Sequence, residues 1–426
     1  LPSEIKKRVP NFDWTAYFKA LGIPQVLQAK VVNFTSETYL SDLSTLITDM
    51  SLSDWKHYLK WHVLHSFADH LTAPIRQAHF ELRQKLTGQK KNKARWKRCL
   101  ALTDSLMGDA LGQKFVAAHF SKDSKVAVTS MIHGIRQAFA KNLPELAWID
   151  DATRIAAREK STQMEFLVGY PSTWRHYPFS VSHSHIGNLI AARQNEVAYD
   201  LAKIGAPVDR SLWSMSPSTV NAYYHPLMNH MVFPAGILQP PFYDATSAFA
   251  VNMGSLGMIV GHELTHGFDD QGSKFDGKGN LKGWWSDTVR SRFEKQTSCI
   301  EKQYSSFDAL PGTKLNGALT LGENIADAGG LKLAYRAYKI RLAQEPALDR
   351  GVVENITPDQ QFFLAASQAW CAAYRPEYAA MLVQVDPHSP PKFRVNGTFS
   401  NMVEFKDAFS CDAKAPMVNQ EQCKVW

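Results

Sequence analysis

The pentapeptide His-Glu-Leu-Thr-His at residues 262–266 is the feature of this sequence that most limits what the chain can fold into. Residues four apart lie on one face of an α-helix, about 6 Å apart along its axis, so a helix here would let His262 and His266 bind one metal ion. Glu263 is rotated away from that face, where it can act as a general base for a metal-bound water. The motif therefore predicts a zinc hydrolase site that needs a third ligand.

The residues around the pentapeptide favour a buried helix. Residues 258–260 and Leu264 are apolar, so the expected helix is apolar on nearly all sides. A surface helix with two solvated histidines is the alternative, but a buried His-Glu-His cluster without a metal would be costly. Gly257 and Gly261 lie one turn apart, and each costs a helix roughly 1 kcal/mol relative to Ala. Close packing of this face against another backbone would compensate for that cost.

The third ligand is expected from a later helix. An HExxHxxGxxH pattern would need a histidine at residue 272, which is Gly here. Glu323 and Asp327 are four residues apart and share one face of a predicted helix. Alone, they would also fit an exposed acidic helix start. Combined with the pentapeptide, they favour Glu323 as a ligand and Asp327 as the acceptor that orients a ligating imidazole. Three protein ligands leave one coordination position open for water, as catalytic zinc sites do.

Hydrolysis of a peptide also needs donors for the tetrahedral oxyanion. The candidates in the C-terminal half are His388 and Arg394, which begin and end the segment His-Ser-Pro-Pro-Lys-Phe-Arg. A single histidine in a Pro-rich loop is also typical of a solvated surface residue. Spacing alone leaves both interpretations of His388 open.

The chain divides by pattern into two domains. Residues 1–183 show apolar residues at helical spacing and carry no chemical motif, which favours a helical scaffold or lid. A linker is expected at residues 177–185, and residues 184–426 carry the motifs. Within the second domain we expect helices over 186–204, 247–268, 322–342 and 358–374, and a β-hairpin formed by 219–224 and 230–233.

The net charge of +7 says little about function. The run Arg83 to Arg98 holds eight Lys or Arg residues. It favours a solvated helix-turn-helix surface, because no recognition motif accompanies it. We therefore expect no nucleic-acid partner. No apolar run reaches 18 residues, so no transmembrane helix is expected.

The five cysteines are an odd number and show no CxxC spacing, which excludes a zinc ribbon. Cys411 and Cys423 frame a loop-like C-terminus, a pattern that favours a disulfide-stapled tail in an oxidising compartment. Free buried thiols in a cytosolic protein are the alternative.

Taken together, the motifs resemble the neprilysin-type zinc metallopeptidases, a family that includes endothelin-converting enzymes and bacterial PepO-like oligopeptidases. The catalytic half is similar to the bacterial members. The matching segments begin near residue 185 and are VNAYY at 220–224, VFPAGILQPPF at 232–242, GHELTHGFDDQG at 261–272, GENIADAGG at 322–330, WCAAYRPEY at 370–378 and CKVW at 423–426.

The resemblance implies a mainly α fold with a small α+β part. A thermolysin-like zincin catalytic domain would span residues 184–426, and a mostly helical domain at 1–183 would cover the active site. One Zn²⁺ per chain would be bound by His262, His266 and Glu323. The implied catalytic residues are Glu263 as base for the zinc-bound water, Asp327 as the group that orients His262, and His388 as oxyanion stabiliser. The implied substrate-binding residues are Asn221, Ala222 and Arg394 for the peptide backbone, and Ile237, Phe242, Met258, Ile259 and Trp370 for an apolar S1′ pocket.

The implied activity is a zinc endopeptidase that cleaves short oligopeptides on the amino side of bulky hydrophobic residues. The implied location is outside the cytosol, in a periplasmic, secreted or membrane-anchored enzyme. A non-catalytic peptide-binding protein with a structural zinc site is the alternative, but such a protein would not need Glu263 as a base.

Family chains extend further at the N-terminus. They pair Cys299 with Cys423, and they pair the positions like Cys99, Cys371 and Cys411 with cysteines upstream. The resemblance therefore implies that this chain is the C-terminal portion of a larger protein, with the missing N-terminal portion as a partner that could be disulfide-linked.

Overall fold

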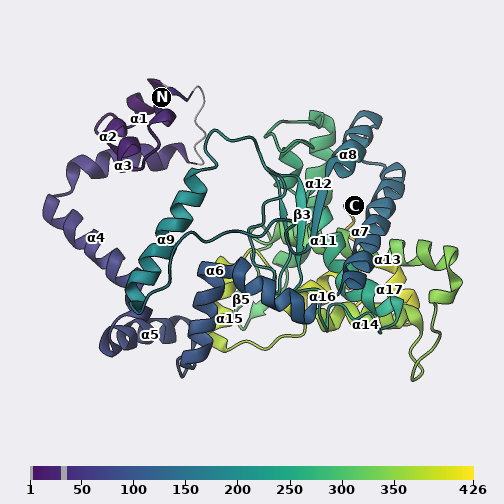
Figure 1. Cartoon of the computed structure of the whole chain (residues 1–426). Coiled ribbons are helices and arrows are strands. Elements are labelled where there is room, and N and C mark those ends of the chain that lie inside the picture. The colour runs from purple at the N-terminus through teal and green to yellow at the C-terminus, as the bar shows by residue number, and fades with distance from the viewer. Residues whose placement is uncertain (1–2, 30–35) are drawn as a thin grey trace. The chain divides into compact units, whose positions relative to one another are not determined.

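The structure is a computed structural model that describes residues 3–29 and 36–426, and most of these residues are helical (Figure 1). The few strands are short. A mainly α fold with a small β part is therefore confirmed. Within the described ranges, no helix has both the length and the apolar character needed to cross a membrane.

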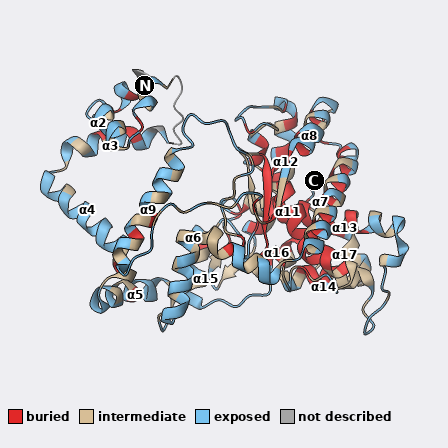
Figure 2. Ribbon diagram, in the orientation of Figure 1, coloured by how far each residue is buried: buried red, intermediate tan, exposed pale blue. Residues whose placement is uncertain are grey.

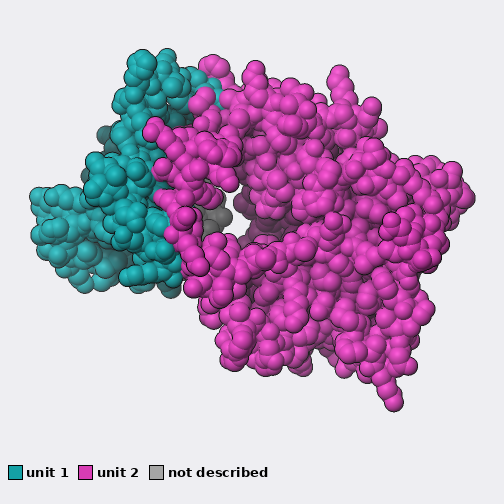
Figure 3. All heavy atoms as spheres, turned by 90° about the horizontal axis from the view of Figure 1, so that it is seen from below, with its two compact units in different colours: residues 1–85, 177–208 teal, residues 86–176, 209–426 magenta. Residues whose placement is uncertain are grey.

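The chain forms two compact units (Figure 3), and unit 1 comprises residues 1–85 and 177–208. Ser51 and Ser184 start two of its helices by accepting a hydrogen bond from the backbone N–H three residues further on. The second of these helices, α9, confirms the helix predicted at 186–204. The elements of unit 1 are α1 (Ser3–Arg8), α2 (Trp14–Ala20), η1 (Pro24–Gln28), α3 (Glu37–Asp49), α4 (Leu52–Phe67), η2 (Ala68–His70), α5 (Ala73–Thr87, which ends just past the boundary) and α9 (His185–Leu201).

Unit 2 comprises residues 86–176 and 209–426 and contains every motif described above. Its helices before the pentapeptide are α6 (Arg95–His119), α7 (Lys122–Asn142), η3 (Leu143–Glu145), α8 (Asp151–Gln163), α10 (Phe249–Asn252) and the π-helical turn η4 (Met253–Gly257). The later helices are α11 (Met258–His266), η5 (Gly272–Lys274), α12 (Asp287–Ser305), α13 (Leu321–Gln344), η6 (Pro346–Leu348), α14 (Pro358–Ala369), α15 (Pro376–Val385), α16 (Pro391–Phe399) and α17 (Val403–Ala408).

These units differ from the division at residue 183 that the sequence predicted. Residues 86–176 group with the motif-bearing half, because α7 packs against α11 and α13. The buried face of α7 carries Ile132, Ile135 and Phe139, all fully buried. Helical periodicity shows that α7 has an apolar face but not which partner covers it.

A three-stranded sheet with the order β1-β3-β2 lies beside the motif helices. The predicted hairpin is confirmed in part: β2 (Tyr223–His225) pairs antiparallel with β3 (His230–Pro234), but residues 219–222 lie outside the strand. Strand β1 (Glu165–Gly169) pairs parallel with β3, in a region that the sequence predicted to be mostly helical and for which it predicted no strand. The strand was not predicted because its partner lies some 65 residues further along the chain, where local periodicity gives no signal. A second small pair joins β4 (Asp308–Leu310) and β5 (Thr313–Lys314).

The helix predicted at 247–268 is formed by three consecutive segments, α10, η4 and α11. Gly254 in the π-helical turn lies so close to α14 that an added Cβ would be 2.0 Å from the carbonyl oxygen of Phe362. The helix predicted at 322–342 is confirmed as α13. The helix predicted at 358–374 ends early, at Ala369, because Trp370 leaves it to lie under the guanidinium of Arg394, 3.6 Å from the ring centre.

The core of unit 2 surrounds α11, and Figure 2 shows buried residues concentrated on β3, α7, α11 and α13. The C-terminal Trp426 is 2% exposed and donates from its indole nitrogen to the carbonyl of Phe268. A disulfide joins Cys299 to Cys423, which confirms the pairing that the family resemblance implied. The predicted staple of the C-terminal tail is confirmed at Cys423, because α12 brings Cys299 to it, whereas Cys411 is unpaired.

Candidate active site

Helix α11 brings the two histidines of the pentapeptide face to face. The Nε2 atoms of His262 and His266 are 2.9 Å apart. His262 and Glu263 are buried, and the side chain of His266 is 18% exposed. The close pairing follows from the four-residue spacing on one helix face, as the sequence predicted.

Each imidazole is held from behind by a carboxylate. Nδ1 of His262 lies 2.9 Å from Oδ1 of Asp327, and Nδ1 of His266 lies 2.7 Å from Oδ2 of Asp269. A carboxylate only accepts hydrogen bonds, so Nδ1 of His266 carries its proton and its Nε2 presents a lone pair, and the short distance from Nδ1 to Asp327 favours the same tautomer for His262. Sequence reasoning missed Asp269. Its position three residues after His266, close enough along the chain for its carboxylate to reach that imidazole, was the available signal.

Glu323, near the start of α13, completes a triangle of ligand atoms. Its Oε2 lies 3.2 Å from Nε2 of His262 and 3.5 Å from Nε2 of His266. This oxygen is buried and accepts no hydrogen bond from any described residue. In the described part of the chain, only these three residues form a cluster of His, Cys, Asp or Glu that could hold a metal ion.

The triangle fits a zinc ion. Zinc bonds to imidazole nitrogen and carboxylate oxygen are about 2.0–2.2 Å long, so tetrahedral ligand atoms should lie roughly 3.3 Å apart. The three observed separations run from 2.9 to 3.5 Å. Two lone pairs and a carboxylate oxygen aimed at one point repel each other unless a cation lies between them. Both the donor types and the spacing therefore suit Zn²⁺.

Electrostatics separates the roles of the acidic groups. Burial raises the pKa of Glu323, but His262 and His266 outweigh it and hold that pKa far below its usual range. Burial similarly opposes ionisation of Asp327, but Arg394 and His262 keep its pKa low. For Glu263 burial dominates and raises the pKa above the ordinary value. A carboxyl group with a raised pKa is suited to accept a proton near neutral pH.

Arg394 lies deeper than the sequence suggested. Its Nε and Nη2 donate to the two carboxylate oxygens of Asp327 at 2.8 and 2.7 Å, and it is buried against Trp370. This paired geometry fixes the carboxylate that contacts His262. The residue also lines the cleft, so contact with a substrate carbonyl remains a prediction.

A cleft of about 480 Å³ opens onto the triangle. It combines an apolar wall with the polar cluster, and it brings together most of the residues that the sequence singled out. Two of those residues do not line it: Met258 is 2% exposed and packs in the core, and the carboxylate of Asp327 lies between His262 and Arg394. The predicted residues that line the cleft are Asn221, Ala222, Ile237, Phe242, Ile259, His262, Glu263, His266, Glu323, Trp370, His388 and Arg394.

His388 lies at the rim of this cleft, with its side chain 46% exposed. Its Nε2 is 3.2 Å from Oε2 of Glu323, and its Nδ1 is 2.8 Å from Oδ1 of Asp386. Asp386 holds the ring so that Nε2 faces the triangle. The tertiary structure thus brings His388 to the site, although its side chain is partly solvated.

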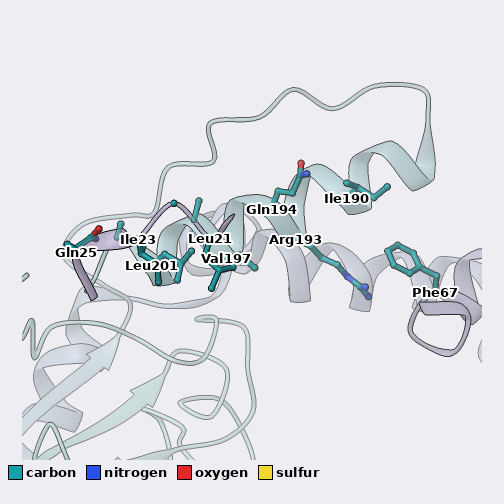
Figure 4. A pocket seen from close by; sticks show the side chains of 12 residues that line it. Leu21, Ile23, Gln25, Phe67, Ile190, Arg193, Gln194, Val197 and Leu201 are labelled. Atoms are coloured by element: carbon teal, nitrogen blue, oxygen red, sulfur yellow. The ribbon is translucent and has the colours of Figure 1, made fainter. Parts of the chain in front are cut away.

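A larger hollow of about 670 Å³ lies within unit 1, between η1 and α9 (Figure 4). Its walls are mainly apolar, with Leu21, Ile23 and Val197 pointing into it. Its one charged lining residue, Arg193, lies over the ring of Phe67 at 4.4 Å. This lining contains no acid–base pair.

Comparison with known proteins agrees with this site. Two family models, both described as peptidase family M13, match residues 2–171 and 221–425. The chain is 36% identical to neprilysin-3 of Drosophila melanogaster over 447 residues, which cover 99% of this chain and 56% of that protein. It is also 36% identical to endothelin-converting enzyme 1 of Rattus norvegicus over 436 residues, which cover 100% of this chain and 57% of that protein.

Among solved structures, the zinc metalloprotease ZMP1 of Mycobacterium tuberculosis in complex with an inhibitor superposes with a TM-score of 0.93 at 35% identity. The match covers 100% of this chain and 65% of that one. The chain thus spans a little over half the length of the two curated relatives.

Proposed function

Because the chain belongs to peptidase family M13, we propose that it is a zinc-dependent endopeptidase. His262, His266 and Glu323 would hold one Zn²⁺ per chain. The observation that carries this proposal is the 2.9 Å approach of two imidazole Nε2 atoms whose other nitrogens both face carboxylates. Nothing but a cation suits the point at which these lone pairs and the Glu323 oxygen converge.

When bound there, Zn²⁺ supplies a Lewis acid that polarises the peptide carbonyl and increases the acidity of water. Glu263 accepts the proton of the attacking water and then donates it to the leaving amine. The raised pKa of its buried carboxyl supports this role, because a weakly acidic group can both take up and release a proton. Asp327 and Asp269 hold the two imidazoles in the tautomer that presents Nε2 to the metal.

Charge that develops on the substrate oxygen needs donors close to the metal site. His388 is the proposed donor in its doubly protonated form, because its Nδ1 faces Asp386 while its Nε2 faces the triangle from the cleft rim. Arg394 is the proposed partner of a substrate backbone carbonyl, supported by its place in the cleft lining. The two hydrogen bonds to Asp327 keep the guanidinium of Arg394 in a fixed orientation.

The proposed substrates are short peptides, cut on the amino side of a bulky hydrophobic residue. The apolar wall formed by Ile237, Phe242, Ile259 and Trp370 supports a preference for such a side chain. Strand β2 is an edge strand of its sheet, and Asn221 and Ala222 precede it in the cleft lining. An extended peptide could therefore bind as an added strand.

We place the enzyme outside the cytosol. The disulfide between Cys299 and Cys423 supports this, because reducing conditions in most cytosols disfavour such bonds.

The test measures zinc content and peptide cleavage together. We expect about one zinc per chain and cleavage of a fluorogenic peptide that has Phe after the scissile bond, in preference to a matched peptide that has Asp there. Glu263→Gln should keep its zinc and lose about 10²- to 10⁴-fold in rate. A variant that retains the wild-type rate would refute the assigned base. Zinc-loaded wild-type protein that binds peptides but cleaves none would instead favour a peptide-binding protein.

A further inference from the structure

Lys160, on α8, is the most deeply buried charged side chain that the proposed mechanism does not use. It is 2% exposed. Its ammonium donates to three backbone carbonyls, those of Gly267 at 2.6 Å, Gly272 at 2.8 Å and Phe275 at 2.7 Å. An ammonium has three N–H donors, so every donor is used. Burial of an unpaired charge costs free energy, and these three carbonyl acceptors compensate for the burial of the ammonium.

The three carbonyls belong to the loop that follows the metal-binding helix. This loop, residues 267–275, begins directly after His266. One lysine therefore ties the start, middle and end of the loop to a single point on α8. The rings of Phe268 and Trp284 lie 5.4 and 5.7 Å from the ammonium and restrict it further.

The same loop carries Asp269 and fixes its carboxylate. Oδ1 of Asp269 accepts hydrogen bonds from the backbone N–H groups of Gln271 at 2.8 Å and Gly272 at 2.6 Å. Oδ2 is left to contact Nδ1 of His266 at 2.7 Å. Gly272 is thus shared: its N–H holds Asp269, and its carbonyl is held by Lys160.

The backbone of Lys160 is fixed as well. The side-chain amide of Asn229 donates to the Lys160 carbonyl at 3.2 Å and to the Gly277 carbonyl at 2.8 Å. The anchor is therefore attached to the strand layer through Asn229, next to β3, and not to α8 alone.

We propose that Lys160 is a positioning residue for the metal site: its ammonium holds the 267–275 loop so that Asp269 orients His266 toward the metal. This inference rests on the proposed function, since it assigns Lys160 a role in zinc affinity. It acts through the loop and Asp269 and does not touch substrate or metal.

The experiment measures the zinc dissociation constant by competition with a chelating dye, in wild type, Lys160→Met, Asp269→Asn and the double variant. Groups that orient metal ligands typically change metal affinity by about 10- to 100-fold. We expect a loss of about 10-fold for Lys160→Met. The zinc dissociation constant of the double variant should be within about threefold of that of Asp269→Asn alone. Lys160 acts on His266 only through Asp269, so the two effects should not add.

Lys332→Met is the matched control. Lys332 donates to the main-chain oxygen of Trp426 at 3.0 Å in the same unit, and in the described part of the chain it forms no hydrogen bond with residues 267–275. Its loss should lower Tm and leave zinc affinity within twofold of wild type. A folded Lys160→Met with wild-type affinity, or losses that add in the double variant, would overturn the proposal.

If Lys160→Met does not fold, Lys160→Arg decides the question. It keeps the charge but replaces a three-donor ammonium with a planar guanidinium. A folded Lys160→Arg with weakened zinc binding supports the proposal, and wild-type binding overturns it. If both variants are unfolded while Lys332→Met folds, Lys160 is a folding determinant and the positioning role is rejected. Failure of wild-type protein to bind zinc would reject the proposed function itself, which is a different result from any of these.

Discussion

Substitution of Gly330 by Ala should disrupt the metal site without touching a ligand. Gly330 lies on α13, where that helix packs backbone to backbone against α11. A Cβ added at Gly330 would be 2.4 Å from the backbone nitrogen of His262 and 2.8 Å from its Cα. The same close contact is seen from the other helix: a Cβ added at Gly261 would be 2.4 Å from the Gly330 carbonyl oxygen. Two glycines thus set the distance between the helix with both histidines and the helix with Glu323.

The size of the effect follows from these contacts. Ordinary contact begins at 3.4 Å, so the new methyl group at 2.4 Å forces α13 and α11 apart by about 1 Å. Zinc ligands must lie within about 0.2 Å of their ideal distances, so such a shift removes Glu323 or His262 from the site. Overpacking of this kind typically costs about 1–3 kcal/mol, and a 1 Å misplacement can cost about 10²-fold in rate. We expect zinc affinity at least about 10-fold weaker and kcat/KM about 100-fold lower.

The assay combines chelator competition, peptide cleavage and denaturant unfolding. Gly134→Ala is the matched control, because Gly134 lies within α7 and an added Cβ there meets nothing within 4 Å. It should stabilise the fold by up to about 1 kcal/mol and leave zinc binding unchanged. If Gly330→Ala bound zinc and cleaved peptide within threefold of wild type, backbone contact would not be what sets the ligand geometry.

Three further outcomes are expected. His388→Ala should lower kcat by about 10²- to 10³-fold with zinc content unchanged, and an undiminished kcat would remove His388 from oxyanion stabilisation. Cleavage requires ionised Glu263, whose pKa burial raises, so kcat/KM should be lost as pH falls through a value above 4.5, whereas an acid limb at or below 4.5 would contradict the raised pKa. Replacement of Cys299 and Cys423 by Ser opens a link across 124 residues and should reduce the free energy of unfolding by about 4–5 kcal/mol in denaturant titrations. No change in the midpoint would refute this.

Local sequence patterns were enough to predict that His262, His266 and Glu323 come together as one triangle of ligand atoms. The four-residue spacing of His262 and His266, and that of Glu323 and Asp327, each define one helix face, and helix geometry is a local property. The same holds for α9 and α13, each of which is one continuous helix where a helix was predicted. Close packing against another backbone was predicted for both Gly257 and Gly261. It is confirmed for Gly261, whereas a Cβ added at Gly257 would meet only the side chain of Met253, at 3.4 Å.

Contacts between distant segments could not be predicted in this way. Strand β1 exists because it pairs with β3, and Arg394 is buried because Asp327 lies opposite it on another helix. Met258 was expected in the cleft but faces the core. Each of these outcomes depends on which partner covers a face, and a pattern within one segment carries no information about its partner.

The sequence by itself determined the ligand types and their order along two helices, because side-chain spacing on a helix needs no tertiary contact. Only the tertiary structure decided that those helices meet at Gly261 and Gly330, and that Asp269 and Lys160 support the second histidine. Those contacts join segments up to about 110 residues apart, and their formation depends on burial and packing across the whole of unit 2.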